Sequence, residues 1–322
     1  MKNFLAVLLI LLCWCPSYAD EEKSVQPEDN WLPYFLSYSV FPLAKDSYET
    51  IIQPQYIRDA DDWLLFLYPQ ISYGVTDSWF VYFNFTPYII LSQQGGTVSL
   101  SGRRGKKEIP PALEENQRTS GLGDCDFGSQ YSWMYINKST FSAAVLINFH
   151  IPTGDINKNL TDGFFRYEPY VVFAKDFIHG GWRTELFSQT GISLVQRLKK
   201  HSSPEDDDRA AHTLILGFGI AERSEKVNLS LEYTLFNNTW NNNGDDNEAY
   251  LTPGIYIQAA KNVAVGLGVP LGLTKQASQY QIIGNILVDI DAPQTAQKTN
   301  KDENANSKKI KWDVQRRKPN KS

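Results

Sequence analysis

The chain has 322 residues, a formal net charge of −5 at pH 7, and a composition that is 42% hydrophobic and 13% aromatic. After the first twenty residues, no stretch has the ~18 uninterrupted apolar residues that a membrane-spanning helix requires. This excludes a helical membrane protein and leaves two classes to separate, an exported soluble protein and a transmembrane β-barrel. We expect no nucleic-acid partner.

The N-terminus has the parts of a secretory signal peptide. Lys2 precedes an apolar run from Phe4 to Trp14, and the segment ends at Ala19, directly before an acidic stretch. The apolar run is too short for a retained anchor, which needs roughly 20 apolar residues. We therefore predict that residues 1–19 are cleaved. Cys125 then remains as the one cysteine, and its place in the apolar phase of a strand indicates a small hydrophobic residue.

Residues 20–47 do not share the pattern of the rest of the chain. They contain prolines at positions 27, 33 and 42 together with several aromatic residues. Proline cannot donate to a sheet ladder, so these prolines argue against a central strand. We predict a periplasmic lead-in over 20–47. The alternative is that residues 31–40 plug or close the barrel.

Most of the remaining chain alternates between apolar and polar residues with the period of a β-strand. The clearest example runs from Gly121 to Gly154, where two alternating stretches flank the turn residues Asn137, Lys138 and Ser139. Twelve such strands are predicted, and together they form a domain over 48–291. Their approximate ranges are 48–57, 63–74, 79–91, 121–136, 140–151, 164–175, 182–196, 211–222, 227–236, 249–259, 263–273 and 280–291.

Short turns and long polar loops alternate between these strands. Short connections follow the second, fourth, sixth, eighth and tenth strands, whereas the long loops cover 92–120, 152–163, 197–210 and 237–248. This alternation is typical of an even-stranded outer-membrane barrel with turns in the periplasm and loops outside. The sequence thus predicts an all-β fold, an antiparallel transmembrane β-barrel of the bacterial outer membrane. The apolar phase of its strands would contact outer-membrane lipid.

The opposite phase of the strands is polar and is predicted to line the lumen. The lumen-lining candidates are Asp124, Asp126, Gln130, Asn148, His150, Arg166, Glu168, Arg183, Glu185 and Gln189. A polar inner face implies water or a polar solute inside, but packed salt bridges in a narrow barrel would give the same pattern. The loop from Ser92 to Ser120 could also fold inward and decide the pore radius.

The C-terminus is basic, with nine Lys and Arg against three Asp and Glu over residues 292–322. Such a composition cannot bury a core, so we predict a disordered tail. Two interpretations stay open. The tail could bind an anionic periplasmic partner, such as peptidoglycan or a membrane surface, through its positive charge, or it could be solvated without a partner.

Candidate catalytic and metal-binding residues are sparse. Four histidines, scattered along the chain, do not form a metal site of ordinary spacing, and no cofactor or metal is expected. The one arrangement to consider for catalysis is His212 with Ser188, since a lipid-facing histidine beside a serine could hydrolyse lipid esters by general-base chemistry. Nothing in the sequence places these two residues within reach, so we expect no enzyme.

Four short motifs, in their order along the chain, resemble a known family. They are Pro69-x-x-x-Tyr73-Gly74-Val75-Thr76-Asp77, Gly121-Leu122-Gly123-Asp124, Pro152-Thr153-Gly154 and Thr252-Pro253-Gly254. The chain is similar over roughly 45–290 to the outer-membrane proteins grouped as the MetA pathway of phenol degradation family. The resemblance implies a barrel that moves small, often aromatic or hydrophobic, compounds across the outer membrane. The chain departs from the family's pattern at Trp79 and Phe80 after the first motif, and it does not end in an aromatic residue.

These observations support three hypotheses. The first is an outer-membrane channel or transporter that passes small, aromatic or hydrophobic solutes through a polar lumen. The second is a closed, salt-bridged barrel that binds a partner through its loops or its basic tail. The third is a lipid-modifying barrel enzyme.

Overall fold

The computed structural model describes residues 33–59, 62–93, 98–102, 105–109, 117–136, 139–158, 160–179, 182–198, 212–237 and 247–290. All of them belong to one compact unit, Leu32–Ser322. The predicted signal peptide and basic tail lie outside the described residues, as does the first part of the predicted lead-in. No helix among the described residues is long and apolar enough to cross a membrane.

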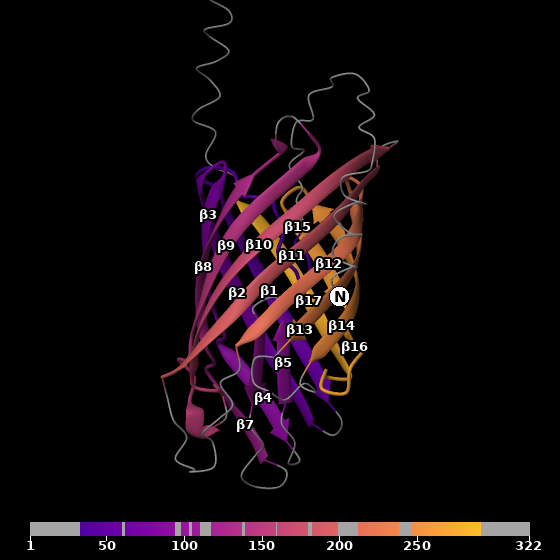
Figure 1. Cartoon of the computed structure of the whole chain (residues 1–322). Helices are drawn as coiled ribbons and strands as arrows, with labels where there is room; N and C mark the ends of the chain where they lie inside the picture. The colour runs from indigo at the N-terminus through magenta and orange to yellow at the C-terminus, as the bar shows by residue number, and fades with distance from the viewer. Residues whose placement is uncertain are drawn as a thin grey trace, which may run out of the picture. The chain divides into compact units, whose positions relative to one another are not determined.

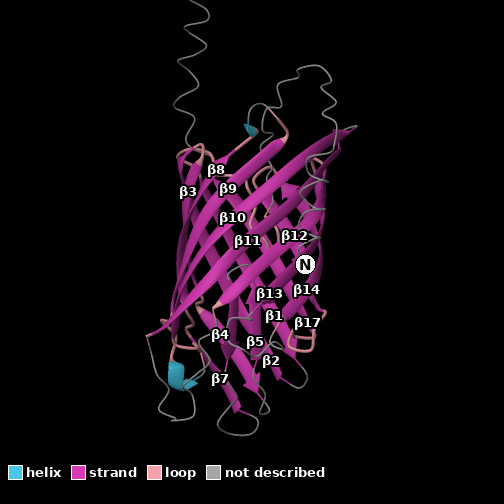
Figure 2. Ribbon diagram, viewed as in Figure 1, coloured by secondary structure: helices cyan, strands magenta, loops and turns pink. Residues whose placement is uncertain are grey.

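The described residues are almost entirely strand, with a short 3-10 helix, η2 (Ile156–Lys158), between two of the strands (Figure 2). The strands are β1 (Tyr48–Asp59), β2 (Asp62–Thr76), β3 (Trp79–Phe85), β4 (Tyr88–Gln93), β5 (Val98–Gly102), β6 (Gly105–Ile109), β7 (Gln117–Gly121), β8 (Cys125–Trp133), β9 (Phe141–Ile151), β10 (Phe164–His179), β11 (Trp182–Arg197), β12 (Thr213–Arg223), β13 (Val227–Asn237), β14 (Glu248–Ala260), β15 (Val263–Gly268), β16 (Leu271–Gly272) and β17 (Tyr280–Ile290).

The strands close into a barrel because β1 pairs with β17 on one side and with β2 on the other (Figure 1). Every pairing is antiparallel, and strands that follow one another in the chain are neighbours in the wall except at the interrupted strands and at β5 and β6, which form a separate two-stranded sheet. Three wall strands are interrupted, so that β3 with β4, β7 with β8, and β15 with β16 each act as one strand. The wall therefore has twelve strands, which confirms the predicted fold class.

The two faces of the wall differ as the period-two pattern requires. Along β10, alternate residues are buried from Phe164 to Asp176, and the residues between them are exposed or half-buried. Aromatic rings cover the outer face, where Phe127 stacks on Phe149 of the neighbouring strand with ring centroids 4.6 Å apart. A wall of this kind keeps its backbone hydrogen bonds within the sheet and presents apolar side chains to lipid.

Two of the interruptions lie side by side in the wall. Pro87 cannot donate a hydrogen bond, and β3 ends at Phe85 just before it. The gap is bridged because the Thr86 N–H donates to the Asp124 carbonyl at 3.0 Å and the Gly123 N–H donates to the Thr86 carbonyl at 2.8 Å. The wall thus stays closed while the chain changes course at both places.

A two-stranded hairpin within the long loop after β4 crosses the lumen. Strand β5 lies against β1 and β2, whereas β6 lies against β12. Strands β1 and β12 are separated in the wall by β17, β15, β14 and β13, so a hairpin that reaches both must span the space between them. The backbone of this loop does fold inward, as the sequence left open.

The close approach of Gly123 to Thr86 and Ile89 leads to a prediction about stability. A Cβ atom on Gly123 would lie 2.5 Å from Ile89 Cδ1 and 2.9 Å from Thr86 Cβ. Gly123→Ala should therefore lower the free energy of unfolding by about 1–3 kcal/mol, the usual cost of overpacking. Denaturant unfolding in detergent micelles measures the change.

The neighbouring Leu122→Ala is the control, because the Leu122 side chain is 68% exposed. It should shift stability by no more than about 0.5 kcal/mol. Equal effects of the two variants would contradict the proposed close approach at Gly123.

Candidate lumen site

Residues 33–41, which precede β1, lie among inward-facing side chains of the wall. Most of their side chains are buried, although the segment contains no strand or helix. The buried apolar members are Tyr34, Phe35, Leu36, Tyr38, Val40 and Phe41. We call residues 33–41 the lumen segment. Its burial has to come from the inner face of the barrel, because its contacts are with side chains of β8, β10, β11, β12, β13 and β14.

One carboxylate of β13 binds the backbone of the lumen segment. The N–H of Phe35 donates to Glu232 Oε1 at 2.7 Å, and the N–H groups of Leu36 and Ser37 donate to Glu232 Oε2 at 3.0 and 2.9 Å. Glu232 is fully buried. Hydrogen bonds to an ionised acceptor are the strong class, so these three bonds fix the segment in the middle of its length.

Tyr34 is held by both its ring and its hydroxyl. The hydroxyl donates to Glu185 Oε1, and Arg223 Nη2 donates to the Tyr34 oxygen at 2.9 Å. The ring stacks on Phe187 with centroids 3.8 Å apart and an interplanar angle of 21°. The phenol group is thus recognised by a carboxylate, a guanidinium group and an aromatic face together.

Phe35 occupies a cradle made by two glycines and a tyrosine. Its ring stacks on Tyr256 at 4.8 Å. A Cβ atom on Gly254 would lie 2.3 Å from the Phe35 ring, and one on Gly268 would lie 2.4 Å from it. Only glycine leaves room for the ring at these two positions, which gives the glycine of the Thr252-Pro253-Gly254 motif a structural role.

The far end of the lumen segment is bound by two glutamines. The N–H of Tyr38 donates to Gln189 Oε1 at 2.8 Å, and Gln130 Nε2 donates to the Ser39 carbonyl at 2.9 Å. The Tyr38 ring packs edge-on against Tyr170 at 4.9 Å. The segment is therefore tethered across the lumen, from β13 to β11 and β8.

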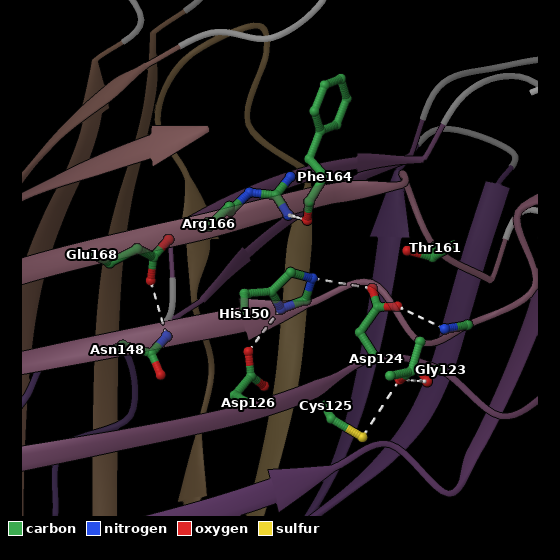
Figure 3. A network of polar contacts seen from close by, with 12 residues as sticks. Gly123, Asp124, Cys125, Asp126, Asn148, His150, Thr161, Phe164, Arg166 and Glu168 are labelled. Carbon is green, nitrogen blue, oxygen red and sulfur yellow. Dashed lines mark hydrogen bonds and ion pairs between the residues drawn. The ribbon is translucent and has the colours of Figure 1, made fainter. Parts of the chain in front are cut away.

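A second polar network lies where β8 begins and β9 ends (Figure 3). His150 Nδ1 is 2.7 Å from Asp126 Oδ1, and His150 Nε2 is 3.1 Å from Asp124 Oδ2. The Tyr68 hydroxyl donates to Asp126. The imidazole thus joins the carboxylate of Asp124, just before β8, to that of Asp126, near the start of β8.

This network holds the loop 152–163 against the barrel. The Gly154 N–H donates to Asp124 Oδ1 at 3.0 Å, and the Thr153 hydroxyl donates to the Gly123 carbonyl at 2.9 Å. Further along the loop, Arg166 binds Asp162. The Gly-Leu-Gly-Asp and Pro-Thr-Gly motifs are therefore partners in space, which explains why both are present.

The same loop contributes to an apolar cluster inside the barrel. Leu160 packs with Ile57 of β1, Leu64 of β2 and Ile89 of β4, and all four are buried. Because these strands are neighbours in the wall, the loop covers the inner surface near the interrupted strands. The lumen is thus narrowed by this loop as well as by the lumen segment.

The predicted lumen-lining residues fall into three groups. All except Arg183 are buried. Gln130, Glu185 and Gln189 bind the lumen segment, whereas Arg183 is partly exposed and pairs with Asp176. The second polar network contains the rest, namely Asp124, Asp126, Asn148, His150, Arg166 and Glu168 (Figure 3).

Some residues of the site were not among the candidates from sequence. Glu232 has the inward phase, but phase alone cannot show that it binds a backbone 195 to 197 positions earlier. Arg223 lies just outside the predicted strand 211–222, yet the structure places it as the last residue of β12, where it meets Tyr34. The aromatic residues of 33–41 were the one feature of the sequence that pointed to this site.

The other candidate sites are a possible metal site and the Ser188–His212 pair. Asp124, His150 and Asp162 bring ligand atoms within 4.8 Å of one another. Their polar atoms are engaged by Gly154, by each other and by Arg166, so the cluster serves to hold the loop and does not fit a metal ion.

His212 and Ser188 are not brought together. Ser188 lies opposite Phe218 of β12. His212 lies six residues before Phe218, which corresponds to about 20 Å along an extended strand. His212 Nδ1 instead accepts the N–H of Val195 at 3.2 Å. The structure therefore does not support the Ser–His pair that the lipid-modifying hypothesis requires.

The role of Asp124 can be tested by Asp124→Asn. The loss of charge should weaken its bonds to Gly154 and His150, so the loop 152–163 should exchange backbone hydrogens faster, by about tenfold for ~1.4 kcal/mol of lost stabilisation. Hydrogen exchange read by mass spectrometry measures this. Asp155→Asn is the control in the same loop: its side chain is 46% exposed and accepts the N–H of Asn157, so it should change exchange at Asn157 at most. Equal exchange in both variants would contradict an anchoring role for Asp124.

One solved structure agrees with the architecture of this chain. The "COG4313 outer membrane channel from Pseudomonas putida F1" matches with a TM-score of 0.50 at 10% identity, over 78% of this chain and 98% of that chain. The NanC porin matches with a TM-score of 0.45 at 8% identity, over 75% and 99%. No curated protein matches the sequence. A family model described as "Putative MetA-pathway of phenol degradation" matches residues 66–298, and the chain belongs to that family.

Proposed function

We propose that the protein is an outer-membrane channel for small solutes and that the lumen segment closes it. The observation that carries this proposal is how the segment is bound. It forms no strand, and its bonds go to side chains of Glu185, Gln189 and Glu232. The ladder of the wall does not depend on it, so the segment can leave while the barrel stays closed on itself.

The character of these contacts also supports reversible closure. The hydrogen bond to Gln189 contributes about 0.5–1.5 kcal/mol net and each bond to a carboxylate about 1.5–3 kcal/mol, because the groups are solvated once they separate. A solute or water that enters can therefore exchange bonds with the segment one at a time. The aromatic faces of Phe187, Tyr256 and Tyr170, which now pack on Tyr34, Phe35 and Tyr38, would then be available to the rings of small aromatic solutes.

The second candidate is a closed structural barrel that binds a partner through its loops or its basic tail. The buried ion pair Arg223–Glu185 and the pairs of Arg166 and Arg183 with aspartates favour a packed interior. A partner for residues 292–322 stays a prediction. The two candidates differ in one property, since a channel conducts when the lumen segment is loosened and a packed barrel does not.

The test is the double variant Tyr34→Ala/Phe35→Ala in planar bilayers. Loss of both ring contacts should free the segment, so the single-channel conductance or open probability should rise at least severalfold above that of the unmodified protein. The matched control is Phe83→Ala/Phe85→Ala, which removes a pair of stacked rings that are exposed on the outer face. Conductance that stays at the background level in every variant would contradict the channel and favour the closed barrel.

A further inference from the structure

Acidic side chains outnumber basic ones among the buried side chains that the structure describes. Among the side chains that the structure describes, the buried carboxylate residues are Asp62, Asp124, Asp126, Asp162, Asp176, Glu168, Glu185, Glu232 and Glu248. The buried basic residues are Arg166, Arg223 and His150, and Arg183 is partly buried. No lysine whose side chain the structure describes is buried. The buried side chains of the wall and of the loop 152–163 thus give the lumen around them a negative potential, which attracts cations and repels anions.

The lumen segment presents donors to this acidic interior. Three of its backbone N–H groups and one hydroxyl bind Glu232 and Glu185, and a fourth N–H binds the Gln189 oxygen. Aromatic rings lie beside these donors and stack on wall residues Phe187 and Tyr256. In chemical terms, the segment occupies the site as an aromatic ligand rich in hydrogen-bond donors.

We propose that the lumen site formed by Glu185, Glu232, Phe187 and Tyr256 binds aromatic ammonium ions and disfavours aromatic carboxylates. This proposal rests on the channel function and names the class of solute that the channel prefers. A buried carboxylate that loses donors is strongly destabilised, so whatever replaces the segment must donate to Glu232, whereas Glu185 keeps its ion pair with Arg223. An ammonium group does this and brings the opposite charge. A carboxylate brings neither.

The size of the preference follows from Coulomb's law. Even with the full screening of water, one unit charge at about 4 Å changes the population of a permeating ion by roughly fivefold. Rings of Asp and Glu produce cation selectivity in channels for the same reason. Permeation of benzylammonium should therefore exceed that of benzoate by at least about fivefold, although the two ions are nearly equal in size.

The experiment measures reversal potentials in planar bilayers at pH 7.5, with benzylammonium chloride and potassium benzoate as probes and potassium chloride as reference. The full chain and the Tyr34→Ala/Phe35→Ala variant should both pass benzylammonium in preference to benzoate. Glu232→Gln should lower that ratio by about fivefold while conductance persists or rises, because the segment is held less tightly. A purely structural role for Glu232 would change conductance and leave the ion ratio unmoved.

Glu222→Gln is the matched control, because it removes the same charge from a side chain on the outward phase of β12 that is 37% exposed. It should leave the ratio unchanged. A conducting channel that prefers benzoate, or a ratio that Glu232→Gln does not lower, would overturn this inference and leave the channel standing. Absence of conductance in both the full chain and the loosened variant would overturn the channel itself.

Discussion

The structure depends on the need of every backbone N–H and C=O group in the wall for a partner, because lipid provides none. A closed antiparallel sheet meets this need, and its pleat sends alternate side chains outward and inward. The outward set is apolar, as in the stacked pair Phe127 and Phe149. The inward set is polar, and its members must in turn find partners in a confined space.

Some of these partners lie on neighbouring wall strands, as with His150 and Asp126, and others come from parts of the chain outside the wall. Glu232 is bound by backbone N–H groups of residues 35–37, and Asp124 is bound by the N–H of Gly154. In each case a carboxylate of the barrel receives a donor from a segment without strand structure. The lumen segment and the loop 152–163 thus narrow the interior together with the β5–β6 hairpin.

Much of the barrel could be predicted from sequence because the alternation of apolar and polar residues that marks each strand is a local pattern. Period two identifies strands such as β10 and β12 directly, and the alternation of short and long connections indicates an even-stranded barrel. The inward phase of Asp126, Asn148 and Glu185 follows from the same counting. The breaks near Pro87 and Gly123 were missed, because two half-strands in line look like one strand when only their alternation is considered.

The site could be predicted only in part because its contacts are not local. Tyr34 meets Glu185 across 151 positions, and Phe35 meets Glu232 across 197. No periodicity links residues so far apart, and a proline-containing aromatic segment is compatible with either a periplasmic lead-in or a plug. The roles of Gly254 and Gly268 likewise appear only once the Phe35 ring lies between them.

The central claim is that the lumen segment closes a channel reversibly, and a disulfide between the segment and the wall tests it most directly. A Cβ on Gly268 would lie 2.4 Å from Phe35 Cγ, so the Cβ atoms of these two positions are close enough for a disulfide. In a Cys125→Ala background, the Phe35→Cys/Gly268→Cys variant should be closed when oxidised and should conduct after reduction. Equal conductance in the oxidised and reduced states would contradict the account.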